Sequence, residues 1–268
     1  TGGHCACARI LLATGAGTTA LFPGETCTAA DLKGALSTDA ALAAFSARRW
    51  TDVERKRARR QVRLERCPLE RVRGRPTQST VGEENHRCSF VGFNTLCAER
   101  ARAPRNARVF FEVTIERCVG VVQLGWIGTV VRCDQESGDG VGDDQVSWGV
   151  DGIRLKKWAG GDTPYRTARK WRDGDVIGCA ADLARGDLSF ALNGVWSGPD
   201  GVAFRGITMP ENGLAPAVTG GYGFACVVNL GDRPWRHGPP AGFRAAHEFF
   251  REAASALDDW LAAHLGGD

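Results

Sequence analysis

Short apolar runs alternate with clusters of Gly, Asp and Asn between about residues 88 and 230. The runs are rich in β-branched and aromatic residues, and one of them alternates partly between apolar and polar positions, as a half-buried strand does. The stretches "ARGD" and "LNG" carry residues that tight turns favour. Short strands at this spacing predict an all-β sandwich or barrel. The runs are "RVFFEVTIE", "VGVVQLGWI", "DVIGCAADL", "DLSFALNG", "LAPAV" and "FACVVNLG".

Helical patterns are found toward the two ends of the chain. About residues 39–66 lack Gly and Pro and are rich in helix formers, which predicts a helix that ends before Pro68. After Pro240, apolar residues recur at spacings of three and four, which predicts an amphipathic helix that stops at Gly266. Its apolar stripe is Ala246, Phe249, Phe250, Ala253, Leu257, Trp260, Leu261 and His264.

These patterns divide the 268 residues into three parts. We expect an N-terminal helical extension over residues 1–79, a β-sandwich over 80–235 and the amphipathic helix within 236–268. No stretch approaches the ~20 apolar residues that span a bilayer. Residues 10–23 are mildly apolar but lack the basic flank of a signal peptide. The chain begins with Thr rather than Met, which is consistent with a piece of a longer protein that has further domains.

A net charge of +3 hides a strongly basic segment. From Arg48 to Arg75 there are twelve Lys or Arg and four Asp or Glu, so the predicted helix is positively charged. Such a helix either contacts nucleic acid, an acidic partner or a membrane surface, or it is a solvated face with internal ion pairs. Nucleic-acid sites interleave aromatic residues with the charge, and aromatics are sparse here, which favours the solvated face.

The ten cysteines stand mostly alone. Cys118, Cys179 and Cys226 lie in or beside apolar, strand-like runs, which is typical of buried thiols that act as small hydrophobic groups. This pattern favours a reduced, intracellular compartment, and we expect the cytoplasm. The sequence "HCAC" near the N-terminus lacks the paired C-x-x-C spacing of a structural zinc site, so we expect no metal and no cofactor.

The stretch "GDGVGDDQVSWGVDG", residues 138–152, combines four Asp with five Gly and allows three interpretations. A calcium loop of the EF-hand type fails, because a start at Asp139 places Val141 at a ligand position and a start at Asp143 places Trp148 where Gly is needed. A phosphate-binding loop should lead into a helix, whereas this stretch leads into a strand-like run. A structural corner of a β-sandwich fits best.

Several motifs in order resemble the SPRY domain of the SPRY/B30.2 superfamily. They are "FFEVTIERCVGVVQLGW", "GDGVGDDQVSWGVDGIRLKKW", "WRDGDVIGCAADLARGDLSFALNG", "LAPAV" and "VNLG", which together cover about residues 88–230. Ala191 replaces a common Ser, "VNLG" replaces the usual "FNFG", and "PYRTARKW" looks a few residues longer than usual. No PRY-type segment precedes the resemblance, which is closest in style to SPRY domains of large intracellular proteins such as ubiquitin ligases and ryanodine receptors.

The resemblance implies a structural role for most of the motif residues. Asp143, Asp144 and Asp151 are expected to hold loops through hydrogen bonds, with Arg154 or Lys156 as partners. The indole side chains are expected to pack in or around the core. The structural set is Asp143, Asp144, Trp148, Asp151, Arg154, Trp158, Asp175, Asn193 and Gly194.

The same resemblance implies a non-catalytic module that presents loops to a protein or peptide ligand. Loops on a rigid sandwich are suitable for recognition, and Tyr and Arg are frequent at binding hot spots. No known catalytic motif is present, and none of the five His lies within the SPRY-like motifs. The expected ligand loops are residues 126–140, 158–171 and 220–224. The candidate ligand residues are Trp126, Arg132, Tyr165, Arg166, Arg169 and Tyr222.

Three functional classes remain open from the sequence. The first is recruitment of a substrate within a ubiquitin-ligase-like protein, and the second is a scaffold domain in a large assembly. The third is binding of nucleic acid or an acidic partner through the Arg-rich helix, which would weaken steeply with salt.

Overall fold

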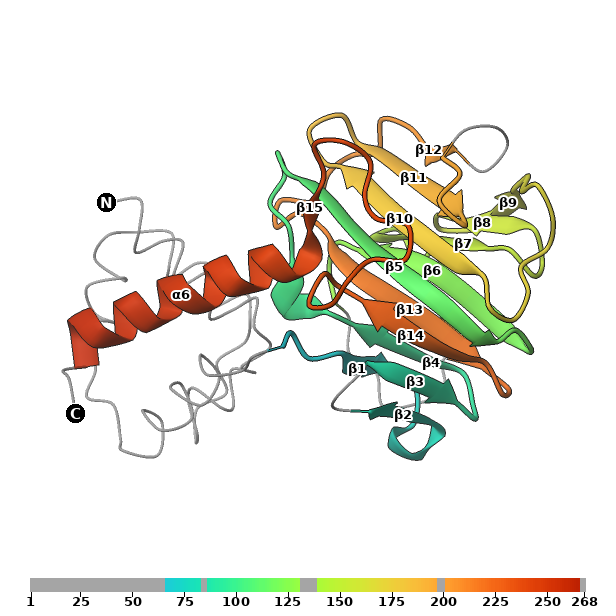
Figure 1. The fold of residues 1–268 in the computed structure, drawn as a ribbon, viewed down its shortest axis with the longest axis horizontal. Helices are drawn as coiled ribbons and strands as arrows, with labels where there is room; N and C mark the ends of the chain where they lie inside the picture. The colour runs from blue at the N-terminus through green and yellow to red at the C-terminus, as the bar shows by residue number, and fades with distance from the viewer. Residues whose placement is uncertain (1–65, 83–85, 131–138, 197–200, 266–268) are drawn as a thin grey trace. The chain divides into compact units, whose positions relative to one another are not determined.

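The computed structural model describes residues 66–82, 86–130, 139–196 and 201–265 (Figure 1). The chain divides into two compact units, Cys67–Glu248 and a second formed by Thr1–Arg66 with Phe249–Asp268. The predicted basic helix falls almost entirely outside the described ranges and stays a prediction. The predicted C-terminal helix is present as α6 (Ala246–Leu265). Within the described ranges, no helix has the length and apolar character needed to cross a membrane.

The described strands form two antiparallel sheets, which confirms the predicted sandwich (Figure 1). In spatial order, the first sheet, here called the β6 sheet, contains β1 (Glu70–Arg73), β4 (Asn94–Cys97), β13 (Ala215–Gly221), β6 (Val121–Ile127), β7 (Ser147–Asp151), β8 (Lys156–Trp158) and β9 (Asp162–Pro164). The second, the β5 sheet, contains β12 (Val202–Phe204), β11 (Asp187–Leu192), β10 (Val176–Asp182), β5 (Arg108–Arg117), β14 (Ala225–Asn229), β3 (Arg87–Phe90) and β2 (Ser79–Gly82). β15 (Arg244–Ala245) adds a short parallel pairing to β5, and two 3-10 turns, η1 (Pro76–Gln78) and η2 (Glu99–Ala101), lie between early strands.

The core lies between the two sheets, where the inward-facing side chains of β5 and β6 meet. Phe111 of β5 packs edge-to-face on Trp126 of β6, with ring centroids 4.9 Å apart, and both side chains are fully buried. Because side chains alternate along a strand, Leu124 and Trp126 face this core while Gln123 and Ile127 face outward. The apolar runs seen in the sequence thus become the central strands.

The sandwich begins earlier in the chain than the predicted boundary at residue 80. β1 pairs with β4 at the edge of the β6 sheet, with an irregularity between Arg71 and Arg73. Its sequence, "ERVR", is short and mostly charged, so it carries none of the apolar alternation that identified the other strands. Pairing with β4 decides its conformation.

A loop covers the outward face of the β6 sheet. This covering loop, residues 139–146, crosses Thr219 of β13, which accepts a hydrogen bond from the Val141 amide at 2.9 Å. Val141 is fully buried in one apolar cluster with residues of β1, β4, β6 and β13. The cluster contains Val72, Cys97, Ile127, Val141, Ala215 and Ala217. The loop therefore gives this sheet a second, smaller core on its outer side.

The opposite outer face, on the β5 sheet, is also covered. Trp196 and Trp235 pack edge-on against Phe110, with ring centroids 5.8 Å and 4.9 Å away. The buried Glu112 carboxylate accepts a hydrogen bond from the Arg236 amide at 2.8 Å, which holds the segment after β14 over the sheet.

Seven described connections share one end of the sandwich, toward which the β5 arrow points at the lower right of Figure 1. Gly221 at the end of β13 pairs with Val121 at the start of β6, so the turns after β5 and β13 meet. The Phe90 amide donates to the Phe224 carbonyl, which adds the turn after β3, and the Gly174 amide donates to the Ile115 carbonyl, which adds the segment before β10. We call this the Tyr222 end. Its described connections are residues 74–78, 91–93, 118–120, 152–155, 165–175, 193–196 and 222–224.

The close approach of the covering loop to β7 generates a stability prediction. A Cβ atom added at Gly149 would lie 2.4 Å from the Val141 carbonyl oxygen, so Gly149→Ala should lift the loop and cost about 2 kcal/mol of unfolding free energy. Gly82→Ala is the matched control, because a Cβ there meets nothing closer than 3.7 Å. Urea unfolding of both variants tests this, and equal stability of the two would contradict the described packing.

Candidate functional site

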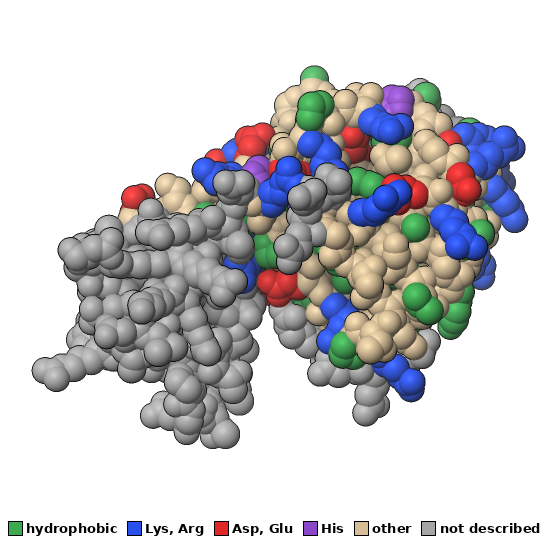
Figure 2. Space-filling view, turned by 60° about the horizontal axis from the view of Figure 1, so that its bottom comes forward, with side chains coloured by type: hydrophobic (Ala, Val, Ile, Leu, Met, Phe, Trp, Pro, Cys, Tyr) green, Lys and Arg blue, Asp and Glu red, His purple; other side chains and the backbone are tan. Residues whose placement is uncertain are grey.

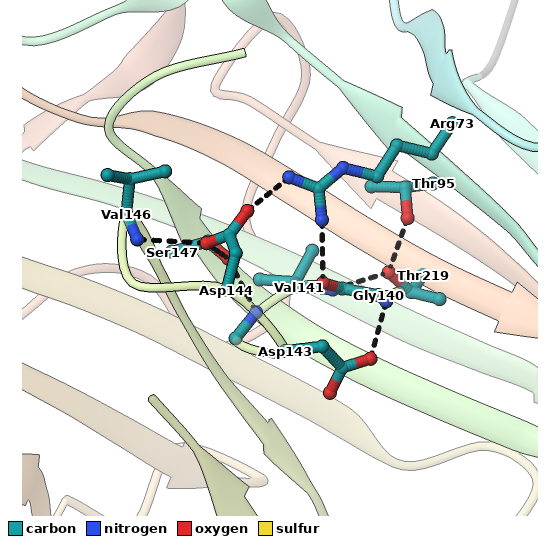
Figure 3. Close-up of polar contacts among 10 residues, drawn as sticks. Arg73, Thr95, Gly140, Val141, Asp143, Asp144, Val146, Ser147 and Thr219 are labelled. Carbon is teal, nitrogen blue, oxygen red and sulfur yellow. Dashed lines mark hydrogen bonds and ion pairs between the residues drawn. The ribbon is translucent and has the colours of Figure 1, made fainter. Parts of the chain in front are cut away.

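Asp144 joins the covering loop to the first strand of the sandwich (Figure 3). Its carboxylate forms an ion pair with Arg73, and it accepts hydrogen bonds from the Ser147 hydroxyl at 2.6 Å and the Val146 amide at 2.9 Å. A second guanidinium nitrogen of Arg73 donates to the Gly140 carbonyl at 3.1 Å. Burial raises the pKa of Asp144, but these donors outweigh burial, so the pKa lies below its ordinary value.

Asp143 has the opposite electrostatic balance. Its carboxylate accepts hydrogen bonds from the Gly140 amide at 2.5 Å and the Gln123 side chain at 2.9 Å, which closes the loop on itself and onto β6. Burial raises the pKa of Asp143 above its ordinary value because no ion pair compensates strongly enough. Two adjacent carboxyl groups thus have pKa values displaced in opposite directions.

The end of β7 is held by Asp151. Its carboxylate accepts the Ile153 and Arg154 amides at 2.7 Å and 2.8 Å, and the Arg154 Nε atom lies 2.5 Å from Oδ2. The same guanidinium lies over the Trp158 ring, 4.6 Å from its centroid. Lys156, the alternative partner considered from the sequence, pairs instead with Asp162.

A third carboxylate, Asp175, organises the segment that leads into β10. Arg169 donates to both of its oxygens, at 2.6 Å and 2.7 Å, and Asn193 donates to Oδ1 at 3.0 Å. Burial raises the pKa of Asp175, but these hydrogen bonds and one from the Arg172 amide lower it below its ordinary value. Asn193 and Gly194 both adopt positive φ at the turn after β11, as the motif "LNG" predicts.

The candidate ligand residues do not form one surface. Trp126 is buried in the core, and Tyr165 is only 6 % exposed, so neither candidate side chain is accessible to a ligand. Arg169 is half-buried and engaged with Asp175, whereas Arg166 is exposed. Arg132 lies outside the described residues. The inward pleat position explains Trp126, and the hydrogen bond of the Tyr165 amide to the Leu155 carbonyl draws Tyr165 against the turn after β7.

The three expected ligand loops also separate. Residues 126–140 leave β6 at the end opposite Tyr222, because Ile127 pairs with Ser147 there. Residues 158–171 begin at that opposite end and return through β9. Of the three loops, only residues 220–224 and the second half of residues 158–171 reach the Tyr222 end.

Tyr222 is the candidate ligand residue that stands out at this end. Its side chain is 60 % exposed, and its backbone adopts φ 56°, a left-handed conformation that favours glycine. Two backbone hydrogen bonds to the end of β3 fix this turn. The Gly223 amide donates to the Phe90 carbonyl at 2.7 Å, and the Phe90 amide donates to the Phe224 carbonyl at 3.0 Å.

Two neighbouring turns add apolar residues that sequence reasoning missed. Val91, in the turn after β3, is 75 % exposed, and Val119, in the turn after β5, is 39 % exposed. A Cβ at Gly223 would lie 3.2 Å from the Val119 Cγ2 atom, so these turns touch. With Tyr222, they are three of the five large apolar side chains exposed in the described part of the chain. Isolated valines in turns carry no sequence signal, and only the sheet topology brings them together.

The described residues contain no group of three or more His, Cys, Asp or Glu arranged to hold a metal ion. Burial and the nearby Asp173 carboxylate raise the pKa of the half-buried Cys118 thiol to about 11, which keeps it protonated at neutral pH. Burial likewise raises the pKa of the Cys67 and Cys179 thiols.

Comparison with known proteins identifies the sandwich. A family model for the SPRY domain matches residues 108–233, from β5 through β14. This part of the chain is a SPRY domain. The match confirms the resemblance noted in the sequence, and β1–β4, which lie before the matched range, complete both sheets of the same sandwich.

One curated relative extends the comparison. The chain is 37 % identical over 140 residues to a protein of Arabidopsis thaliana named E3 ubiquitin-protein ligase RKP. The aligned part is 52 % of this chain and 10 % of the relative, so the chain spans about a tenth of that protein's length. SPRY domains are typically protein-interaction modules, which agrees with the general function expected from the sequence.

The ion pair between Arg73 and Asp144 generates a second stability prediction. Asp144→Ala leaves the Arg73 side chain, only 6 % exposed, without its carboxylate, and should cost about 2–3 kcal/mol of unfolding free energy. The control is Glu116→Ala, which removes the partner of the exposed Arg87 and should cost far less. Urea unfolding near neutral pH distinguishes the two, and similar losses would rule out a special role for the buried pair.

The opposite pKa displacements of Asp143 and Asp144 predict opposite pH effects. Asp144 stabilises the fold above the unfolded pKa of about 3.9, and that contribution is lost as pH falls through the lower folded pKa. The stability gap between wild type and Asp144→Asn should therefore narrow in acid. Asp143 has a raised folded pKa, so the balance between wild type and Asp143→Asn should shift toward wild type as pH falls. Urea unfolding from about pH 7 to about pH 3 measures both, and parallel curves would contradict the assignment.

Proposed function

We propose that the Tyr222 end of this SPRY domain binds a protein ligand and that the chain is a non-catalytic recruiting module within a larger, ubiquitin-ligase-like protein. The observation that carries the proposal is Tyr222 itself, a large exposed side chain held at positive φ between two glycines. Strained backbone at an exposed aromatic residue is characteristic of recognition sites rather than of stabilising positions.

Rigidity of the turn supports this role. Backbone hydrogen bonds connect Gly223 and Phe224 to Phe90, so Tyr222 extends from a turn that is already fixed by β3. A side chain that is ordered before binding loses little further freedom when a ligand covers it. Val91 and Val119 extend the apolar surface around it, and exposed apolar residues that cluster are typical of protein-interaction sites.

Residues 165–175 border the same end and contribute one exposed candidate. Arg166 is exposed, whereas Arg169 is held by Asp175. Of these two arginines that the sequence proposed as ligand residues, Arg166 is therefore the one suited to contact a ligand. Arg169 acts instead as a positioning residue, because its double hydrogen bond to Asp175 fixes the path of this segment.

The ligase setting rests on the curated relative, whose name describes a ubiquitin ligase. A SPRY domain that covers a tenth of such a protein would act by delivering a substrate to a catalytic part elsewhere. An intracellular location, expected from the cysteine pattern, suits this role. A scaffold domain without a ligand is the competing function, and it predicts that Tyr222 has no binding role.

Tyr222→Gly separates binding from folding. Glycine accepts φ 56° without strain, so the variant should be at least as stable as wild type while losing the aromatic contact. In quantitative affinity capture from cell lysate with the full chain, bound partners should fall roughly tenfold or more. Val202→Ala, at an exposed position on the edge strand β12, should leave capture unchanged.

The competing outcomes are distinct. Partners retained equally by wild type, Tyr222→Gly and Val202→Ala, with unchanged thermal unfolding, would move binding away from this end. Absence of any reproducible partner would favour the scaffold function.

A further inference from the structure

We infer that the ligand of the Tyr222 end is an acidic peptide whose apolar side chain lies on Tyr222 and whose carboxylate binds Arg117. This inference rests on the proposed function and adds the chemical class of the ligand. The apolar part of the surface is Tyr222 with Val91 and Val119. The charged part is the Arg117 guanidinium, which lies beside the Tyr222 turn: a Cβ atom added at Gly223 would be 3.9 Å from the Arg117 Cζ atom.

The turns that form this surface contain basic but no acidic residues. Arg117 ends β5 and is exposed, and no hydrogen bond or ion pair joins its side chain to another described residue. Arg75 is exposed beside η1, whose Gln78 carbonyl accepts the Val91 and Gly92 amides. A guanidinium without a carboxylate partner is suited to bind one in a forked geometry. The turns concerned are residues 74–78, 91–93, 117–120 and 221–224.

Bordering residues extend the positive charge. Arg166, Lys170 and Arg172 are exposed on residues 165–175. One oxygen of the exposed Asp173 accepts the Cys118 amide at 2.6 Å, and Asp175 is neutralised by Arg169. Figure 2 shows Lys and Arg side chains gathered along the right-hand edge of the sandwich. In Figure 1, the segment that connects β9 to β10 lies on this side of the sandwich. The field at this end therefore favours a negatively charged partner.

The surface suits a peptide better than a nucleic acid. Single-stranded nucleic acid is bound along basic grooves with a series of aromatic side chains on which successive bases stack. Here one exposed aromatic side chain, Tyr222, is flanked by two valines, which matches a single apolar anchor of a peptide with acidic residues beside it.

The test uses the full 268-residue chain and a display library of random 12-residue peptides as the probe. Selected peptides should be enriched in Asp and Glu next to one aromatic or aliphatic residue. In fluorescence anisotropy, Arg117→Glu should weaken these peptides roughly tenfold or more, and added salt should weaken the wild-type complex. Arg205→Glu, the same charge change at an exposed position beyond β12, should leave the affinity unchanged.

The outcomes separate this inference from the proposed function. Peptides that need Tyr222 but lack acidic residues, and that bind Arg117→Glu normally, would overturn the acidic ligand and leave the binding surface standing. Peptides that bind Tyr222→Gly as well as wild type would overturn both. A single-stranded oligonucleotide that binds through Arg117 more tightly than any selected peptide would replace the peptide by a nucleic acid.

Discussion

The buried contact between Arg73 and Asp144 is the constraint on which the outer half of the β6 sheet depends. It ties the edge strand β1 to the covering loop, and the same guanidinium holds the Gly140 carbonyl of that loop. Val141 can then close the apolar cluster on the outward face of the sheet. Without this tie, a sheet face with Thr, Gln and small apolar residues would be exposed to water, and the loop's polar backbone would lose its partners.

The acidic, glycine-rich stretch therefore has a structural task. Its carboxylates accept hydrogen bonds from backbone amides and from side chains of other strands, and its glycines let the backbone approach the sheet closely. Asp151 and Asp175 use the same device at two further connections, at the Tyr222 end. Because the carboxylates of Asp144, Asp151 and Asp175 are satisfied internally, they stiffen their own connections and are not available to a ligand.

The Tyr222 end combines that rigidity with groups that have no internal task. Tyr222, Val91 and Arg117 extend from turns that neighbouring strands hold in place. Exposed aromatic, aliphatic and cationic groups on fixed turns provide complementary contact for an acidic partner, whereas the residues engaged with Asp175 only shape the surroundings. A division between shaping and contacting residues is what an interaction module on a rigid sandwich requires.

The sequence by itself determined the strand-rich sandwich, its central strands, the SPRY family and the C-terminal helix. Those features follow from local periodicity, turn residues and motifs that are contiguous in the chain. Only the tertiary structure decided that β1 belongs to the sandwich, that Arg73 is the partner of Asp144, and that Trp126 and Tyr165 are buried. It also decided that Tyr222, Val91, Val119 and Arg117 share one surface. The physical reason is that pairing between distant strands, and the alternation of side chains across a sheet, set burial and neighbourhood independently of residue type.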